Sequence, residues 1–168
     1  MKLEPNVWFD EVVKTYHLIS PHIHHTQLVT CPDLNEELDG MYLFKPESLQ
    51  ITGSFKVRGA LSAISRLSKK ELKRGVIAYS SGNHAQGVAH AAKVFNTPAT
   101  VVMPKDAPER KIANAQALGA EVIFYDRRTE SREKMSIEIA KERDLVIINP
   151  YDALATIYGQ GTAAYEVI

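Results

Sequence analysis

The sequence predicts an α/β protein built around a parallel sheet. From about residue 56 onward, short apolar runs alternate with amphipathic segments of roughly 10–13 residues, which is the pattern of β–α–β units. The short runs are apolar throughout rather than alternating, as expected for strands that are buried on both faces. Glycine, proline and capping residues separate the segments and define their order.

The first third of the chain carries weaker signals. Residues 6–16 have apolar side chains near helical spacing, which predicts an amphipathic helix. After Pro21 the chain is expected to be irregular until Met41–Phe44, a short run of strand-forming residues.

Boundaries are clearer in the rest of the chain. Ser68 and Glu71 form a capping box that begins a short helix, and Gly75 ends that helix. Asp106 is expected to cap a later helix that has Pro108 in its first turn. The predicted helices cover residues 56–67, 68–75, 83–95, 106–119, 132–143 and 153–168, and the predicted strands cover 76–79, 99–102, 121–125 and 145–148.

Composition and charge exclude several classes of protein. The 20 Lys and Arg residues balance 20 Asp and Glu residues, which argues against binding to a nucleic-acid backbone. A hydrophobic content of 45% argues against disorder, and no apolar run approaches the roughly 20 residues that cross a bilayer. The N-terminus lacks the apolar core of a secretory signal, and the single cysteine, Cys31, fits a reducing compartment. We expect a cytoplasmic protein with no nucleic-acid or membrane partner.

The last predicted helix has no stop signal. Glu166, Val167 and Ile168 continue its pattern without a glycine, asparagine or proline. The expectation from this pattern is that the natural sequence continues and that the fold is truncated here.

A loop after the strand 76–79 is the first candidate site. Ser80–Gly87 offers two hydroxyls, a glycine and the free N–H groups of a helix N-terminus, which suit a carboxylate or a phosphate. The alternative is that Ser81 or Asn83 only caps the helix and Gly82 only turns the chain. Dinucleotide and nucleoside-triphosphate fingerprints are absent from the sequence.

A lysine at the start of an apolar helix is the second candidate. Lys56 lies between Phe55 and Val57, and burial there would favour the neutral, nucleophilic amine. The alternative is an ordinary surface lysine.

Together these segments resemble a known family. Gly53–Ala60 (GSFKVRGA) is similar to the cofactor-lysine motif of threonine dehydratases and serine racemases, which are pyridoxal-phosphate enzymes of fold type II. The loop Ser80–His84, the segment Tyr158–Thr162 and the segment Ile19–Thr26 occur in matching order. The resemblance implies a fold like that of the tryptophan synthase β subunit, and it covers nearly the whole chain.

The resemblance also implies residue roles. Lys56 would hold pyridoxal 5'-phosphate as a covalent Schiff base and move the Cα proton of the substrate. Phe55 would lie against the cofactor ring, and Asn83 would bind the cofactor's 3-hydroxyl group. Ser81 would serve the opposite face of the substrate in a racemase. The implied binding site for the substrate carboxylate consists of Ser80, Ser81, Gly82, Asn83 and His84.

The implied reaction is deamination of L-threonine or L-serine to 2-oxobutyrate or pyruvate and ammonia, in a homo-oligomer. The alternatives are serine racemisation and a non-catalytic truncated remnant. The resemblance divides the chain into an opening segment (1–52), a small α/β domain (53–152) and the start of a return helix (153–168). A glycine-rich loop for the cofactor phosphate, which such enzymes carry further on, is missing from the sequence.

Three positions depart from the family pattern. His25 stands where arginine is usual, Gln27 where proline is usual, and Tyr158 where alanine is usual. Cys31 has no nearby base and is expected to be structural. A cluster of histidines near the N-terminus matches no tetrahedral zinc spacing, so no metal is expected. Its members are His17, His22, His24 and His25.

Overall fold

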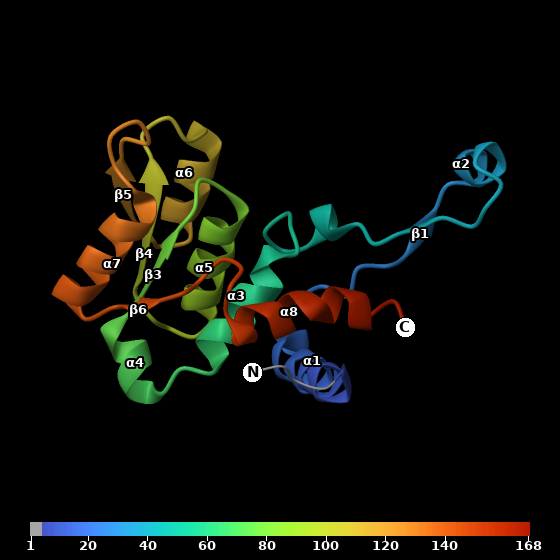
Figure 1. Cartoon of the computed structure of the whole chain (residues 1–168), viewed down its shortest axis with the longest axis horizontal. Coiled ribbons are helices and arrows are strands. Elements are labelled where there is room, and N and C mark those ends of the chain that lie inside the picture. Colours follow the sequence, from blue (N-terminus) through green and yellow to red (C-terminus); the bar gives the residue numbers. More distant parts are fainter. Residues whose placement is uncertain (1–4) are drawn as a thin grey trace.

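A four-stranded parallel sheet is the centre of the larger body in the computed structural model, which describes residues 5–168 (Figure 1). The strands lie in the order β5-β4-β3-β6. They are β3 (Val76–Tyr79), β4 (Ala99–Pro104), β5 (Glu121–Tyr125) and β6 (Val146–Ile147). Val76 of the inner strand β3 is in register with Ala99 on one side and Val146 on the other. Every residue of β3 is buried, which explains why this run is apolar throughout.

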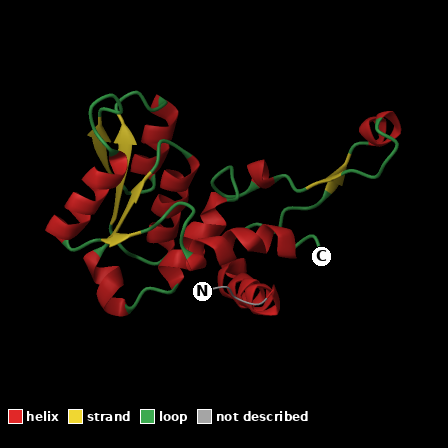
Figure 2. Ribbon diagram, in the orientation of Figure 1, coloured by secondary structure: helices red, strands yellow, loops and turns green. Residues whose placement is uncertain are grey.

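Helices cover both faces of the sheet (Figure 2). On one face the core contains Ala78, Val101 and residues of α3, α5 and α6. On the other face Ile77 and Val102 pack with residues of α7. Neighbouring strand residues therefore point to opposite faces, as the pleat requires. The helices from α3 onward are α3 (Lys56–Ser65), α4 (Lys69–Arg74), α5 (Asn83–Val94), α6 (Glu109–Ala117), α7 (Arg132–Arg143) and α8 (Leu154–Tyr165).

Helix α8 packs closely against α3 and against α1 (Pro5–Ile19). A Cβ atom on Gly159 would lie 2.5 Å from the Arg58 carbonyl oxygen and 2.6 Å from the Gly59 Cα, so a glycine is needed at this helix crossing. The neighbouring Tyr158 is buried, and its ring centroid lies 5.4 Å from that of Trp8 on α1. Helix α1 therefore provides the aromatic partner for the tyrosine that departs from the family pattern.

Replacing Gly159 by alanine is expected to lower the free energy of unfolding, because the added methyl group meets backbone atoms that cannot rotate away. Overpacking of this kind costs about 1–3 kcal/mol. Gly161→Ala is a matched control on the same helix, since the three atoms nearest to its Cβ all belong to the Val12 side chain and none to backbone. Urea denaturation of both variants should show the larger loss for Gly159→Ala. Equal stabilities would contradict the close helix crossing.

The segment before α3 extends away from the sheet (Figure 1). Two short antiparallel strands, β1 (Val29–Thr30) and β2 (Leu43–Phe44), flank the helix α2 (Pro32–Glu37). The prediction of an irregular chain before Met41 was therefore wrong. Pro32 in the first turn of α2 was the available signal, since proline favours that position.

Most later boundaries are confirmed. The structure confirms the capping box of Ser68 and Glu71. The predicted cap at Asp106 was wrong, because α6 begins at Glu109 with Pro108 at the N-cap and no side-chain cap. Asp106 instead pairs with Arg127, and the Asp106 oxygen lies 2.9 Å from the guanidinium nitrogen. Asp106 lies before Pro108, outside the N-cap position, so its side chain does not cap the helix.

Within residues 5–168, none of the helices combines the length and the hydrophobicity that a membrane-spanning segment needs.

Candidate active site

An open cleft lies where β3 and β6 end, at the carboxyl edge of the sheet. This is the edge where parallel α/β sheets bind ligands. The cleft has a volume of about 420 Å³. Its lining residues come from α3, the end of β3 and the loop after it, α5, α6, α7 and the loop after β6. They are Lys56, Tyr79, Ser80, Ser81, Gly82, Asn83, His84, Lys111, Arg132, Pro150 and Tyr151. None of these described lining residues is acidic.

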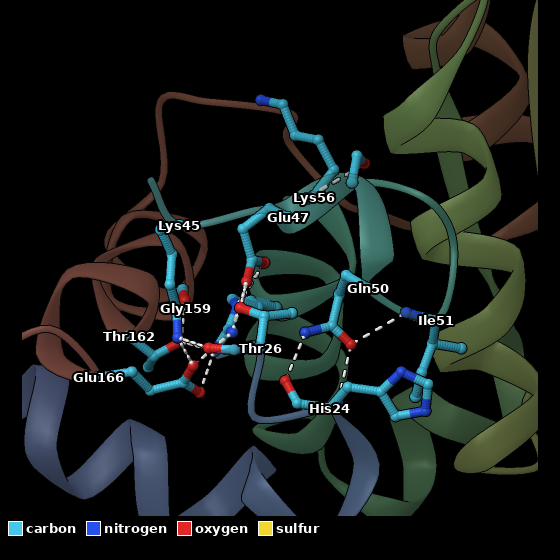
Figure 3. Close-up of polar contacts among 12 residues, drawn as sticks. His24, Thr26, Lys45, Glu47, Gln50, Ile51, Lys56, Gly159, Thr162 and Glu166 are labelled. Atoms are coloured by element: carbon cyan, nitrogen blue, oxygen red, sulfur yellow. Dashed lines mark hydrogen bonds and ion pairs between the residues drawn. The ribbon is translucent and has the colours of Figure 1, made fainter. Parts of the chain in front are cut away.

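The amine of Lys56 faces this cleft from the first turn of α3. Its Nζ donates a hydrogen bond to the carbonyl oxygen of Pro150 at 2.9 Å and lies 5.3 Å from the centre of the Phe55 ring. The Lys56 side chain points in the opposite direction from the side chains of Lys45 and Glu47 (Figure 3). Lys56 is half-buried, and within the described part of the chain it has no carboxylate partner. This is an amine held in place without a counter-charge, unlike a typical surface lysine.

The loop after β3 brings the N-terminus of α5 to the same cleft. Ser81 and Asn83 are exposed, and a Cβ on Gly82 would meet no atom within 4 Å, so a ligand can approach the backbone here. The Asn83 Oδ1 accepts a hydrogen bond from Lys111 Nζ at 2.6 Å. The Gly82 N–H donates to Ser80 Oγ at 3.2 Å. The helix N-terminus and the nearby cations together form a site suited to an anion.

His84 differs from its neighbours in this loop because its ring is buried. It is 2% exposed, and its Nε2 lies 3.0 Å from the carbonyl oxygen of Ile148. Burial, together with the positive charge of Lys56, lowers the pKa of His84 to about 4. Any contact of His84 with a substrate carboxylate would therefore come from its backbone and not from its ring.

The buried ring makes stability depend on pH. In the unfolded protein the pKa of this histidine is near 6.5, whereas in the folded protein it is about 4. Between these pH values the unfolded state binds more protons, so the free energy of unfolding falls as the pH drops through this range. By pH 5 the loss from His84 is about 2 kcal/mol. Urea denaturation at pH 7 and pH 5 should show a smaller loss for His84→Gln, which cannot titrate. Parallel losses in the two proteins would contradict a neutral, buried His84.

Several cleft residues were not predicted from the sequence. Tyr79 ends β3, and Pro150 and Tyr151 follow β6, so the rule that ligands bind at carboxyl strand ends could have identified them. Arg132 begins α7 and places its guanidinium carbon 5.7 Å from the centre of the Tyr79 ring. Lys111 comes from the first turn of α6, and no local pattern marks it.

A buried cluster of charged side chains surrounds Arg58, which lies in the first turn of α3. Arg58, with a side chain that is 0% exposed, binds Glu47 and Glu166 at 2.8 Å and 2.7 Å. Lys45 also binds Glu166 (Figure 3). Burial acts to raise the pKa of each carboxyl group, but hydrogen bonds from Arg58 hold both values below the usual range. The cluster joins the segment before α3 to the end of α8.

The N-terminal histidines bind separate partners. The His22 ring packs on Phe95 at a centroid distance of 5.7 Å, the His24 Nδ1 lies 3.3 Å from the Leu49 carbonyl oxygen, and the His25 Nδ1 lies 3.4 Å from the Tyr16 hydroxyl. Within the described residues, no group of three or more His, Cys, Asp and Glu side chains is arranged to hold a metal ion.

Comparison with known proteins agrees with this fold. Residues 19–168 match the family model described as pyridoxal-phosphate dependent enzyme. The chain is 43% identical over 160 residues to L-threo-3-hydroxyaspartate ammonia-lyase of Saccharomyces cerevisiae, covering 95% of this chain and 49% of the relative. It is 39% identical over 162 residues to L-threonine ammonia-lyase of Thermotoga maritima, covering 96% of this chain and 40% of the relative.

A solved structure shares the same fold. Maize serine racemase superposes with a TM-score of 0.90 at 36% identity, covering 94% of this chain and 48% of that one. The chain spans about half the length of the curated relatives it matches. The match to the family model covers nearly the whole chain, so the protein belongs to the family of pyridoxal-phosphate dependent enzymes.

Proposed function

We propose that this chain supplies the cofactor lysine and the substrate-carboxylate site of an ammonia-lyase that acts on L-threonine and L-serine. The observation that carries the proposal is the placement of Lys56 Nζ and the N-terminus of α5 in one cleft with no acidic lining residue. The anion site suits the carboxylate of an α-amino acid, and the amine is the group that condenses with the aldehyde of the cofactor. The names of the hydroxyaspartate and threonine ammonia-lyases support the same reaction class.

The cleft residues fit the cofactor of the family. Lys56 offers an amine without a carboxylate partner, Phe55 offers an aromatic face that is 41% exposed, and Asn83 offers an exposed side-chain amide. Lys56 would bind the aldehyde of pyridoxal phosphate, Phe55 would contact its ring, and Asn83 would bind its 3-hydroxyl group. When bound, pyridoxal phosphate acts as an electron sink for the negative charge that develops at the Cα atom of an amino acid.

The residues of the chain then provide binding and proton transfer. The N–H groups at the start of α5 and the Ser81 hydroxyl bind the α-carboxylate, because these residues line the cleft and the first N–H groups of a helix have no partner within it. The amine of Lys56 is the base available for the Cα proton. Loss of the β-hydroxyl as water and hydrolytic release of ammonia then give 2-oxobutyrate from threonine or pyruvate from serine.

The test is reductive trapping on the 168-residue chain. Pyridoxal phosphate is added, borohydride fixes any adduct, and peptide mass spectrometry locates it. We expect the adduct on Lys56, and we expect L-threonine to reduce its yield more than D-threonine does. The two enantiomers react identically with the free cofactor, so a difference can come only from the chiral cleft. Adducts spread evenly over the lysines, with no preference between enantiomers, would refute the proposal.

Serine racemisation is the second candidate, and one observation favours it. Ser81 presents an exposed hydroxyl in the cleft that Lys56 lines, and racemisation needs a proton carrier on each face of Cα. Ser81→Ala should therefore lower D-serine formation from L-serine more than pyruvate formation. Equal loss of both products would argue against a role on one face.

A further inference from the structure

The short segment that follows β6, residues 148–150, contacts two hydrogen-bond donors: the buried ring of His84 and the half-buried amine of Lys56. The Ile148 carbonyl oxygen is 3.0 Å from His84 Nε2, and the Pro150 carbonyl oxygen is 2.9 Å from Lys56 Nζ. One donor comes from α5 and the other from α3, so two helices contact this segment two residues apart.

The other polar groups of this segment bind elsewhere. The Ile148 N–H donates to the Ile77 carbonyl at 2.9 Å, which continues the pairing of β6 with β3. The Asn149 carbonyl accepts from Thr156 Oγ1 at 2.9 Å, at the start of α8. Pro150 has no N–H group to contribute. Among the described residues, the His84 ring is the group that holds the Ile148 carbonyl oxygen.

The protonation of His84 suits this task. A neutral imidazole has one N–H, and the carbonyl oxygen beside Nε2 requires that proton to lie on Nε2. The buried Nδ1 has no hydrogen-bond partner among the described residues. Burial and the charge of Lys56 lower the pKa of the ring to about 4, so the ring remains neutral and its tautomer is defined.

We propose that His84 is a positioning residue for Lys56: its Nε2–H fixes the Ile148 carbonyl and thereby places the Pro150 carbonyl that holds the Lys56 amine. The inference rests on the proposed function for its catalytic meaning, because Lys56 is the cofactor lysine there. It differs from a substrate-binding role for the His84 side chain, since the ring is buried and its Nε2 contacts a backbone carbonyl.

The test compares two amide variants that differ in where they place an N–H. In His84→Gln the amide nitrogen can replace Nε2, whereas in His84→Asn it lies near the position of Nδ1. The readout is the rate at which acetic anhydride modifies Lys56, measured by peptide mass spectrometry relative to the exposed Lys73 and Lys93. His84→Gln should match the wild type. His84→Asn should modify Lys56 about five- to tenfold faster, because the ammonium loses a charge-assisted hydrogen bond.

Equal rates for the wild type and both variants would overturn the proposal. Equal acceleration in both variants would also overturn it, since the ring would then act only by filling space. If His84→Asn does not fold, long-range ¹⁵N NMR of the wild-type chain decides instead: an Nε2–H tautomer supports the proposal, and an Nδ1–H tautomer refutes it. Acylation needs no cofactor, so failure of the reductive trapping experiment leaves this test independent.

Discussion

Replacing Lys56 by alanine is expected to abolish the cofactor adduct that borohydride fixes on this chain. The Schiff base requires a primary amine, and Lys56 Nζ faces the cleft from the first turn of α3, where it lies 2.9 Å from the Pro150 carbonyl oxygen. Lys56→Arg should fail equally, since it keeps the positive charge but has no amine that condenses with an aldehyde. The measurement is the mass of the reduced protein after incubation with pyridoxal phosphate.

The control for this loss is Lys93→Ala, which removes an exposed lysine from the last turn of α5. We expect it to form the adduct as the wild type does. A Lys56→Ala chain that carries the same amount of reduced cofactor as the control would show that another lysine is used, and the assignment of Lys56 would be wrong.

Replacing Arg58 by methionine is expected to destabilise the fold by about 3–5 kcal/mol, the cost of removing one partner from a buried ion pair. The Arg58 side chain is 0% exposed and contacts Glu47 and Glu166, whose side chains are 12% and 1% exposed. Methionine fills much of the same volume but leaves both carboxylates buried without their guanidinium. Urea denaturation at pH 7 measures the change in the free energy of unfolding.

The matched control is Arg74→Met, which breaks an ion pair with Asp144 at the surface. That pair is open to solvent, so its loss should cost no more than about 1 kcal/mol. Adding Glu47→Gln to Arg58→Met should recover part of the stability, because Glu47 then has no ion-pair partner among the described residues, whereas Glu166 keeps Lys45. Similar losses for Arg58→Met and Arg74→Met would contradict a buried cluster.

The order of helices and strands was largely determined by local sequence. Strand β3 was predicted from Val76 to Tyr79 because a strand buried on both faces must be apolar at every position. Helix α7 was predicted with the same bounds that the structure shows, Arg132–Arg143. Helix α2 and the start of α6 were missed or misplaced, because short and exposed elements carry little periodicity. The division into residues 1–52, 53–152 and 153–168 stays a prediction.

The sequence by itself determined the chemical groups of the candidate site, because Lys56 and Ser80–His84 lie in two contiguous motifs at element boundaries. Only the tertiary structure decided which groups surround them. The Pro150 carbonyl that holds Lys56 is 94 residues away in the chain, and Glu166 lies 108 residues from Arg58. Periodicity reports which face of an element is buried, but it carries no information on which distant element covers that face. For the same reason the sequence could show His84 in the loop but not that its ring is buried against the Ile148 carbonyl.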